Sequence, residues 1–262
     1  SMNKVSRCLG ITCTADIGLL AISYTCIEGT DTYTQSISLP TTGVNTHKLM
    51  ELELFMKEFP DKVSTCSVKH IHEVLDEIQK FPANYKAWNL GLASALACGA
   101  FTFLLGGGPV EMCCAFLGAG VGNFVRKKML GHSISLLANV AVSVAASCLV
   151  YVLTILLAQS LLSVSAVHQA GYICAMLFVI PGFPLITGGI DLAKLDLRSG
   201  LERVSYALLI ILTATMTGWA TAAICQFQPA DFEPLQLQKW TLLCFRLITS
   251  FCGVYGFSLM FN

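Results

Sequence analysis

Long stretches without any Asp, Glu, Lys or Arg occupy most of the chain after residue 87. The longest of them run over residues 88–110, 129–190 and 204–230. A helix needs about 20 mainly apolar residues to cross the hydrocarbon core of a bilayer. The pattern therefore predicts six transmembrane helices, near residues 88–105, 109–125, 134–157, 169–190, 203–227 and 240–261.

The first 87 residues are patterned differently and predict a small α+β domain. Apolar side chains recur at helical spacing within Ser64–Phe81, which indicates an amphipathic helix. Another helix is expected over Asn45–Phe59, with Pro60 ending it. Two β-forming segments, Cys13–Thr25 and Asp31–Leu39, are separated by a turn and predict a hairpin.

The predicted fold class is an all-α polytopic membrane protein of about six transmembrane helices, with a small N-terminal cytosolic α+β domain. The composition changes near Pro82–Ala87, so we place the domain boundary there. Residues 1–87 form the predicted cytosolic domain and residues 88–227 a five-span transmembrane bundle. Residues 228–262 supply an outer loop and the sixth transmembrane helix.

The composition supports a membrane protein. Only 12% of the 262 residues are charged, against roughly 25% in an average soluble domain. Lys and Arg together number 16, and so do Asp and Glu, so the formal net charge is zero. These values exclude a disordered chain, a nucleic-acid binder that works through bulk positive charge, and an ordinary soluble enzyme.

The charges between the predicted spans indicate the orientation in the membrane. Six basic residues lie in the loops on one side, three near residues 126–128 and three between 194 and 203. The loops on the other side hold only Lys239. Because basic loops stay in the cytoplasm, we expect the N-terminus to be cytoplasmic.

The most informative candidate site is a break inside the fourth predicted span. Pro181, Gly182 and Pro184 fall within an apolar run that would otherwise be one helix. Proline removes a backbone donor and clashes with the preceding turn, and Pro184 should also push Phe183 out of the α region. Transporters bind substrates at such discontinuous helices. The simpler alternative is an ordinary proline kink.

Two isolated charges in the predicted spans have alternative roles. Arg246 would face an anionic substrate group or a carboxylate such as Glu111, or it would extend its side chain to the membrane surface. Glu111 follows a run of three glycines and a proline. It would either couple proton movement or lie in water at the interface.

A group of charges follows the predicted break. This group would form a gate of ion pairs, or simply a solvated cytoplasmic segment; its members are Asp191, Asp196, Arg198, Glu202 and Arg203. Asp191 lies closest to the break and is the first candidate among them.

The sequence contains no pattern for metal binding or for nucleophilic catalysis. His70 and His72 are two residues apart and would point in different directions from a helix, so they cannot share a metal ion. His132 and His168 fall on opposite sides of the predicted membrane. We therefore expect a protein that is not an enzyme and that uses no metal or cofactor.

The chain resembles the threonine/serine exporter family, specifically its larger N-terminal component. The matching segments are Gly43–Leu49, Gly106–Gly108, Gly118–Gly122, Ile180–Thr187, Asp191–Ala193 and Asp196–Arg203. The segment Ile180–Thr187 contains the two prolines, and it places Thr187 among the candidate substrate-contacting residues. Arg246–Phe251 and Phe257–Asn262 are similar to the first span of the family's second component.

This resemblance implies the export of threonine and serine, driven by the proton gradient or the membrane potential. Related two-component members export dicarboxylates such as succinate, which is the alternative substrate class. The implied partners are the lipid bilayer, a small polar substrate, and the second component or further C-terminal spans. A homo-oligomer is the alternative assembly, and no nucleic acid is expected. The rival hypothesis is a membrane sensor or scaffold without transport, whose cytosolic domain binds a partner or ligand.

Overall fold

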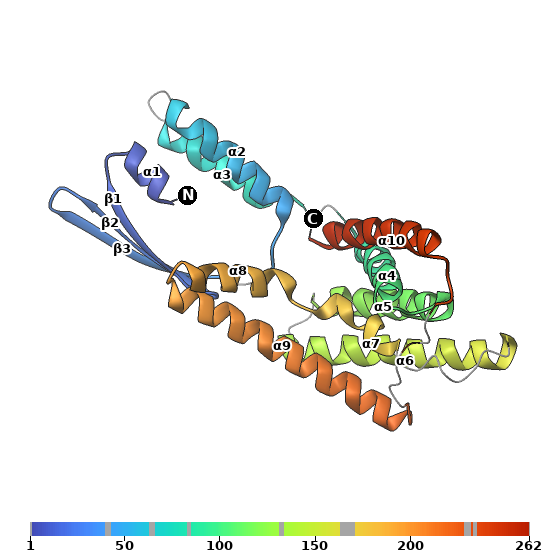
Figure 1. The fold of residues 1–262 in the computed structure, drawn as a ribbon. Coiled ribbons are helices and arrows are strands. Elements are labelled where there is room, and N and C mark those ends of the chain that lie inside the picture. The colour runs from blue at the N-terminus through green and yellow to red at the C-terminus, as the bar shows by residue number, and fades with distance from the viewer. Residues whose placement is uncertain are drawn as a thin grey trace. The chain divides into compact units, whose positions relative to one another are not determined.

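A computed structural model describes residues 2–39, 43–62, 66–82, 85–130, 134–162, 171–227, 232 and 235–261 of the chain. It divides into two compact units. The first comprises residues 1–84, 186–204 and 261–262, and the second comprises residues 85–185 and 205–260. The long helices predicted from the apolar stretches all form, together with a small sheet near the N-terminus (Figure 1).

The sheet of the first unit is antiparallel and has the order β1-β2-β3. Its elements are α1 (Met2–Cys8), β1 (Thr12–Ile17), β2 (Ala21–Glu28) and β3 (Asp31–Ser38). The predicted hairpin is confirmed: Glu28 pairs with Asp31 across a two-residue turn, and Gly29 adopts a φ of +58° there. The predicted first segment, Cys13–Thr25, is two strands rather than one, since the chain reverses between β1 and β2.

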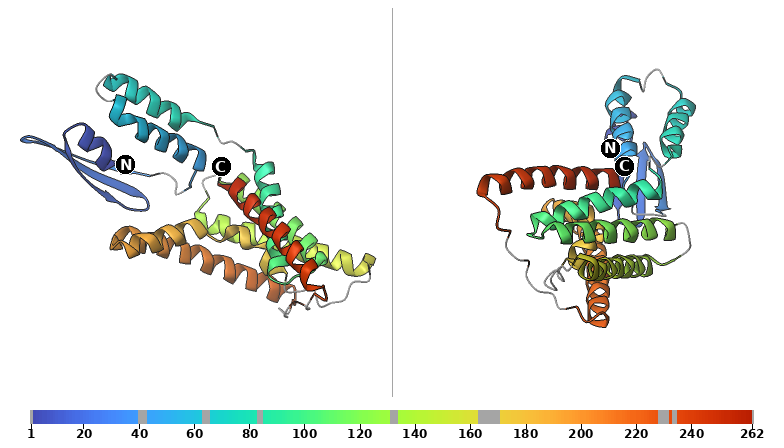
Figure 2. Two further views of the ribbon diagram at one scale, coloured as in Figure 1. Left: turned by 45° about the horizontal axis from the view of Figure 1, so that its top comes forward. Right: turned by 90° about the vertical axis from the view of Figure 1, so that its right-hand side faces the viewer.

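Two helices, α2 (Thr46–Lys62) and α3 (Val68–Lys80), complete this part of the first unit and lie side by side (Figures 1 and 2). The expectation that Pro60 ends the first helix is wrong, because α2 continues through it to Lys62. A proline so close to the helix end removes a single hydrogen bond while its neighbours keep theirs. Ser67 caps α3 by accepting a hydrogen bond from the His70 N–H at 3.3 Å.

The second unit is helical. It contains α4 (Ala87–Leu104), α5 (Pro109–Met129), α6 (Leu136–Leu162), α7 (Tyr172–Ala175), the 3₁₀ helix η1 (Leu177–Val179), most of α9 (Leu197–Ile224) and α10 (Lys239–Met260). The helix α8 (Gly182–Ala193) begins in this unit, and its later residues belong to the first. α5 packs against both α4 and α6, and α10 packs against α4. Glycines allow the last contact, because a Cβ atom at Gly256 would lie 2.6 Å from the Ala93 carbonyl oxygen.

Four helices are long and apolar enough to cross a membrane: α4, α6, α9 and α10. The pair α7–η1 and α8 passes the same test together, with a bend of 59° at the break, and makes a fifth if it counts as one span. The remaining helix, α5, occupies the second predicted span, but charged residues at both of its ends make it more polar than the others. The helices are therefore found where the sequence predicts them, and length and composition support four or five of the six as spans.

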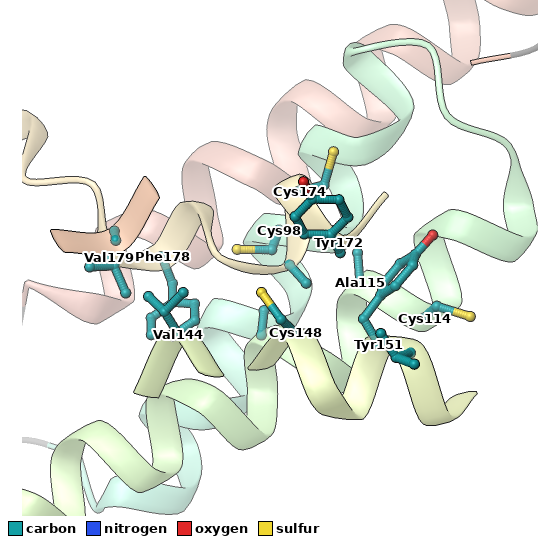
Figure 3. Close-up of a cluster of buried hydrophobic side chains, with 14 of the residues drawn as sticks. Cys98, Cys114, Ala115, Val144, Cys148, Tyr151, Tyr172, Cys174, Phe178 and Val179 are labelled. Atoms are coloured by element: carbon teal, nitrogen blue, oxygen red, sulfur yellow. The ribbon is translucent and has the colours of Figure 1, made fainter. Parts of the chain in front are cut away.

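A cluster of buried apolar side chains holds the second unit together (Figure 3). Tyr151, Cys148 and Val144 of α6 pack here with Phe178 of η1, and all four are at most 3% exposed. Four cysteines are buried in it, Cys98, Cys114, Cys148 and Cys174, and all four thiols are free. They act as small apolar packing groups.

Candidate functional site

The predicted break is present and has a definite geometry. α7 and η1 end at Val179, and α8 starts at Gly182 in a direction 59° away. Between them Ile180 is extended, with φ −60° and ψ 120°. The residue before a proline disfavours the α conformation, so Pro181 accounts for this.

Pro184 does not contribute to the break in the way expected. Phe183 and Pro184 are both helical, in the first turn of α8, so the prediction that Pro184 displaces Phe183 from the α region is wrong. The first N–H groups of a helix have no intrahelical acceptor, and a proline there costs little. Pro181 is therefore the residue that interrupts the span.

Backbone carbonyls freed at the break are bound by side chains from neighbouring helices. The Ser147 hydroxyl of α6 donates to the Ala175 carbonyl at 2.8 Å. The Arg126 guanidinium of α5 donates to the Phe178 carbonyl at 3.4 Å. A buried carbonyl without a partner is costly in an apolar surrounding, so these two side chains stabilise the interrupted span.

α5 approaches the break closely because its facing positions are glycines. A Cβ atom at Gly122 would lie 2.7 Å from the Ser147 Cβ and 2.8 Å from the Phe178 Cζ. At Gly118 it would lie 2.8 Å from the Ser147 carbonyl oxygen. Gly118 and Gly122 are small residues four positions apart on one helix face, and this spacing allows α5 to reach both α6 and η1.

A buried polar stripe runs along α6 towards the break. Asn139, Ser143 and Ser147 follow one another at intervals of four residues and are 2%, 0% and 0% exposed. The Asn139 amide donates to the Arg126 backbone carbonyl at 3.2 Å. On α5, the fully buried Asn123 amide donates in the same way to the Leu90 carbonyl at 2.8 Å.

The orientation of these two amides follows from their partners. A backbone carbonyl can accept a hydrogen bond only from the NH₂ group of a side-chain amide. The NH₂ group of each asparagine therefore faces the backbone carbonyl, and Oδ1 does not. In the part of the chain that the structure describes, Oδ1 of Asn123 and Oδ1 of Asn139 have no hydrogen-bond partner. Each therefore keeps an unused acceptor in a buried place.

Sequence reasoning missed Arg126, Asn139 and Ser147 as parts of this site. The available signal was the four-residue spacing of polar residues within an apolar run, which predicts a common helix face. Their relation to the break was not readable, because Arg126 and Phe178 are 52 positions apart.

The charged cluster after the break is paired, and it belongs to the first unit. Arg203 forms an ion pair with Asp191 at 2.8 Å, and the Ser199 hydroxyl bonds to the same carboxylate at 3.1 Å. Both charged side chains are largely buried, at 27% and 21% exposure. Asp196 instead accepts from the Ser199 N–H at 3.4 Å, which caps the start of α9.

Arg198 connects α9 to the sheet. It pairs with Asp16 at the end of β1, and with Glu202 at 3.2 Å. Glu202 in turn accepts from the Leu19 N–H at 2.7 Å. The side chains of Arg198, Asp16 and Glu202 are 64%, 54% and 38% exposed, so water and salt screen these ion pairs and each adds little to stability.

Glu111 is only 3% exposed, and its carboxylate accepts from the Gly108 N–H at 3.0 Å at the start of α5. In this chain it is thus a buried group rather than one lying in water. Arg246 is exposed on α10, and no ion pair to Glu111 or to any other carboxylate is found in the described ranges.

The predicted site residues therefore fall into separate groups. Pro181, Gly182 and Pro184 belong to the second unit, together with Arg126 and Ser147. The predicted residues from Thr187 to Arg203 belong to the first unit, and Arg246 lies on α10, whose packing partner is α4. Within the described residues, no cluster of three metal-ligating side chains occurs. His132 and His168 lie outside the residues that the structure describes.

Two comparisons with known proteins both find similarity to transporters. The ThrE family, described as "Putative threonine/serine exporter", matches residues 1–225. A Klebsiella aerogenes protein named "Probable succinate transporter subunit YjjP" is 25% identical over 218 residues, which cover 82% of this chain and 80% of that protein. No solved structure matches the chain. The apolar helices and these similarities together indicate an integral membrane protein that is related to transporters.

Proposed function

Because the chain belongs to the threonine/serine exporter family, we propose that it is one component of a secondary exporter for small carboxylate-bearing metabolites, with threonine and serine as its first substrates. Export runs from the cytoplasm across a bacterial inner membrane. The proton gradient or the membrane potential drives it. The protein acts by binding and moving its substrate, without catalysing a chemical reaction.

The observation that carries this proposal is the interrupted span. α7–η1 and α8 meet at a 59° bend, and the carbonyls beside it are bound by Arg126 and Ser147. A broken helix brings polar backbone groups to a membrane segment, and substrates of transporters bind at such points.

The N-terminal unit lies in the cytoplasm in this proposal, on the side of the basic loops. A second component supplies the remaining spans, since the YjjP relative is named as a subunit. In the first unit, Asp191 and Arg203 form an ion pair that opens and closes during transport. Thr187 and Gly182 lie on α8, which also carries Asp191 and moves when this ion pair opens.

Two observations favour alternatives. The name of the YjjP relative favours succinate as the substrate. A cavity of about 340 Å³ between α2 and α3, lined by Phe55, Phe59, Ile78 and acidic residues, favours a ligand-sensing role of the cytosolic unit. Such a sensor would bind its ligand without any flux of substrate across the membrane.

Substitution of the prolines tests the role of the break. Pro181→Ala should lower threonine export by about tenfold or more, because a continuous helix misplaces the substrate-binding groups. Pro184→Ala should have a smaller effect, since Pro184 lies within a helix turn that tolerates it. The measurement is labelled-threonine flux in proteoliposomes, normalised to inserted protein.

Pro109→Ala is the matched control, because Pro109 starts α5 without interrupting any helix. It should export at the wild-type rate. Wild-type flux from both Pro181→Ala and Pro184→Ala would show that the break has no role in transport.

A further inference from the structure

Arg126 differs from the other basic residues at its end of α5. The three residues Arg126–Lys128 close the helix and were predicted only to orient it in the membrane. Lys128 lies over the Phe124 ring, with its Nζ 5.1 Å from the ring centre. Arg126 instead is partly buried and reaches η1, the last turn before the break. It lies about 26 Å along α5 from Pro109, at 1.5 Å per residue.

The bond that Arg126 makes to the break is a weak one. Its Nη1 lies 3.4 Å from the Phe178 carbonyl oxygen, whereas a typical N–H···O bond is about 2.9–3.0 Å long. The acceptor is also neutral. A guanidinium has five N–H donors in a planar fork, and within the described ranges the Phe178 carbonyl takes only one of them.

A carboxylate would be a much better partner for this guanidinium. Arginine and carboxylate form two parallel, charge-assisted hydrogen bonds, which are shorter and roughly twice as strong as neutral ones. Threonine, serine and succinate all carry a carboxylate. A substrate that reaches Arg126 would therefore compete successfully with the Phe178 carbonyl.

We propose that Arg126 is the residue that recognises the substrate carboxylate, and that it releases the Phe178 carbonyl when the substrate binds. The proposal rests on the transport function inferred above. Release of the carbonyl links substrate binding to the break, because the end of η1 then loses its bond to α5. The Ser147 bond to Ala175, one turn earlier, keeps α7 attached to α6 meanwhile.

The buried amides next to Arg126 favour an α-amino acid over a dicarboxylate. Asn139 is anchored to the Arg126 backbone, and its Oδ1 remains an acceptor among the described residues. An acceptor oxygen attracts an ammonium group and repels a second carboxylate. The Arg126 guanidinium and the Asn139 acceptor oxygen thus offer one partner for each of the two charges of a zwitterion.

The test measures both binding and flux, with probes that differ in the carboxyl group. Labelled threonine is bound to the purified chain in detergent, and its counterflow is measured in proteoliposomes with the second component supplied. Unlabelled serine, succinate and threonine methyl ester, which lacks the negative charge, are the competitors. For the wild type we expect serine to compete strongly, succinate weakly and the ester hardly at all.

Three variants separate recognition from structure. Arg126→Gln should weaken threonine binding at least tenfold and abolish the preference for serine over the ester, while Arg126→Lys should retain part of that preference. Lys128→Gln, two residues away, should leave both the threonine affinity and the preference for serine over the ester unchanged. Ser147→Ala removes an uncharged bond at the same break, so it should reduce the transport rate without changing the preference.

Each outcome decides between the two proposals. If the wild type transports threonine and Arg126→Gln keeps the wild-type affinity and preference, Arg126 does not recognise the carboxylate and the transport function stands. Equal effects of Arg126→Gln and Ser147→Ala on rate, with the preference intact in both, would make Arg126 a purely structural residue. Threonine binding that depends on Arg126, but without flux, would support recognition and overturn transport. If succinate is the stronger competitor, the site recognises dicarboxylates and the argument from Asn139 is wrong.

Discussion

At the residue scale, the interior of the second unit depends on glycines at positions where the neighbouring atoms leave no space for a side chain. Gly122 lies where α5, α6 and η1 converge, next to Ser147 and Phe178. Both neighbours are buried, so neither can move aside freely. The same close approach lets Arg126, one helical turn further on, reach the Phe178 carbonyl.

Gly122→Ala tests this convergence. The added methyl group would lie within 3 Å of Ser147 and Phe178, so overpacking should destabilise the protein by about 1–3 kcal/mol. The thermal unfolding midpoint in detergent should fall accordingly. Gly189→Ala on α8 is the control: a Cβ atom there meets nothing within 4 Å, and its midpoint should be unchanged or slightly higher. Equal midpoints for the two variants would contradict the packing described for Gly122.

Single residues differ in how far their roles can be predicted from the sequence. Pro181 acts on its immediate neighbours, so local rules identified the break correctly. Arg126 acts on a carbonyl far away in the chain, and the rule that assigned it to a basic loop treats all loop cations alike. Glu111 is buried by the packing of other helices, which its own neighbours in the sequence do not reveal.

At the element scale, apolar length was the reliable signal. It located α4, α6, α9 and α10, because each must remain apolar along a whole span. It was less reliable at helix ends. Pro60 and Pro184 are both tolerated within a turn of a helix terminus, where few hydrogen bonds are lost.

α5 is the element whose membrane crossing most needs a direct test. It is shielded on two sides by α4 and α6, so its polar ends need not face lipid. We predict that it crosses, with Leu105 outside and Leu130 in the cytoplasm. These residues flank the helix and are similarly exposed, at 56% and 57%.

The measurement is labelling of Leu105→Cys and Leu130→Cys in intact cells with a membrane-impermeant maleimide, read out peptide by peptide so that the native thiols do not interfere. Leu105→Cys should react in intact cells, and Leu130→Cys only after permeabilisation. Reaction of both from the same side would show that α5 does not cross. The reverse pattern would invert the proposed orientation.

At the scale of the whole molecule, the sequence divided the chain into a polar and an apolar part, and the structure has two compact units. The segment 186–204 belongs with the N-terminal unit, although it follows the broken span in the chain. Its ion pair with Asp16 and its hydrogen bond to the Leu19 N–H join positions that meet only after folding. Hydropathy could not have predicted this assignment.

The central claim is that this chain is an exporter component, and counterflow in proteoliposomes tests it most directly. The chain would be reconstituted alone and together with a second exporter component, with labelled threonine, serine and succinate as substrates. We predict counterflow of threonine and serine only when both components are present. Correctly inserted protein that gives no flux of any of the three substrates, with or without the second component, would contradict the claim and favour a sensor or scaffold.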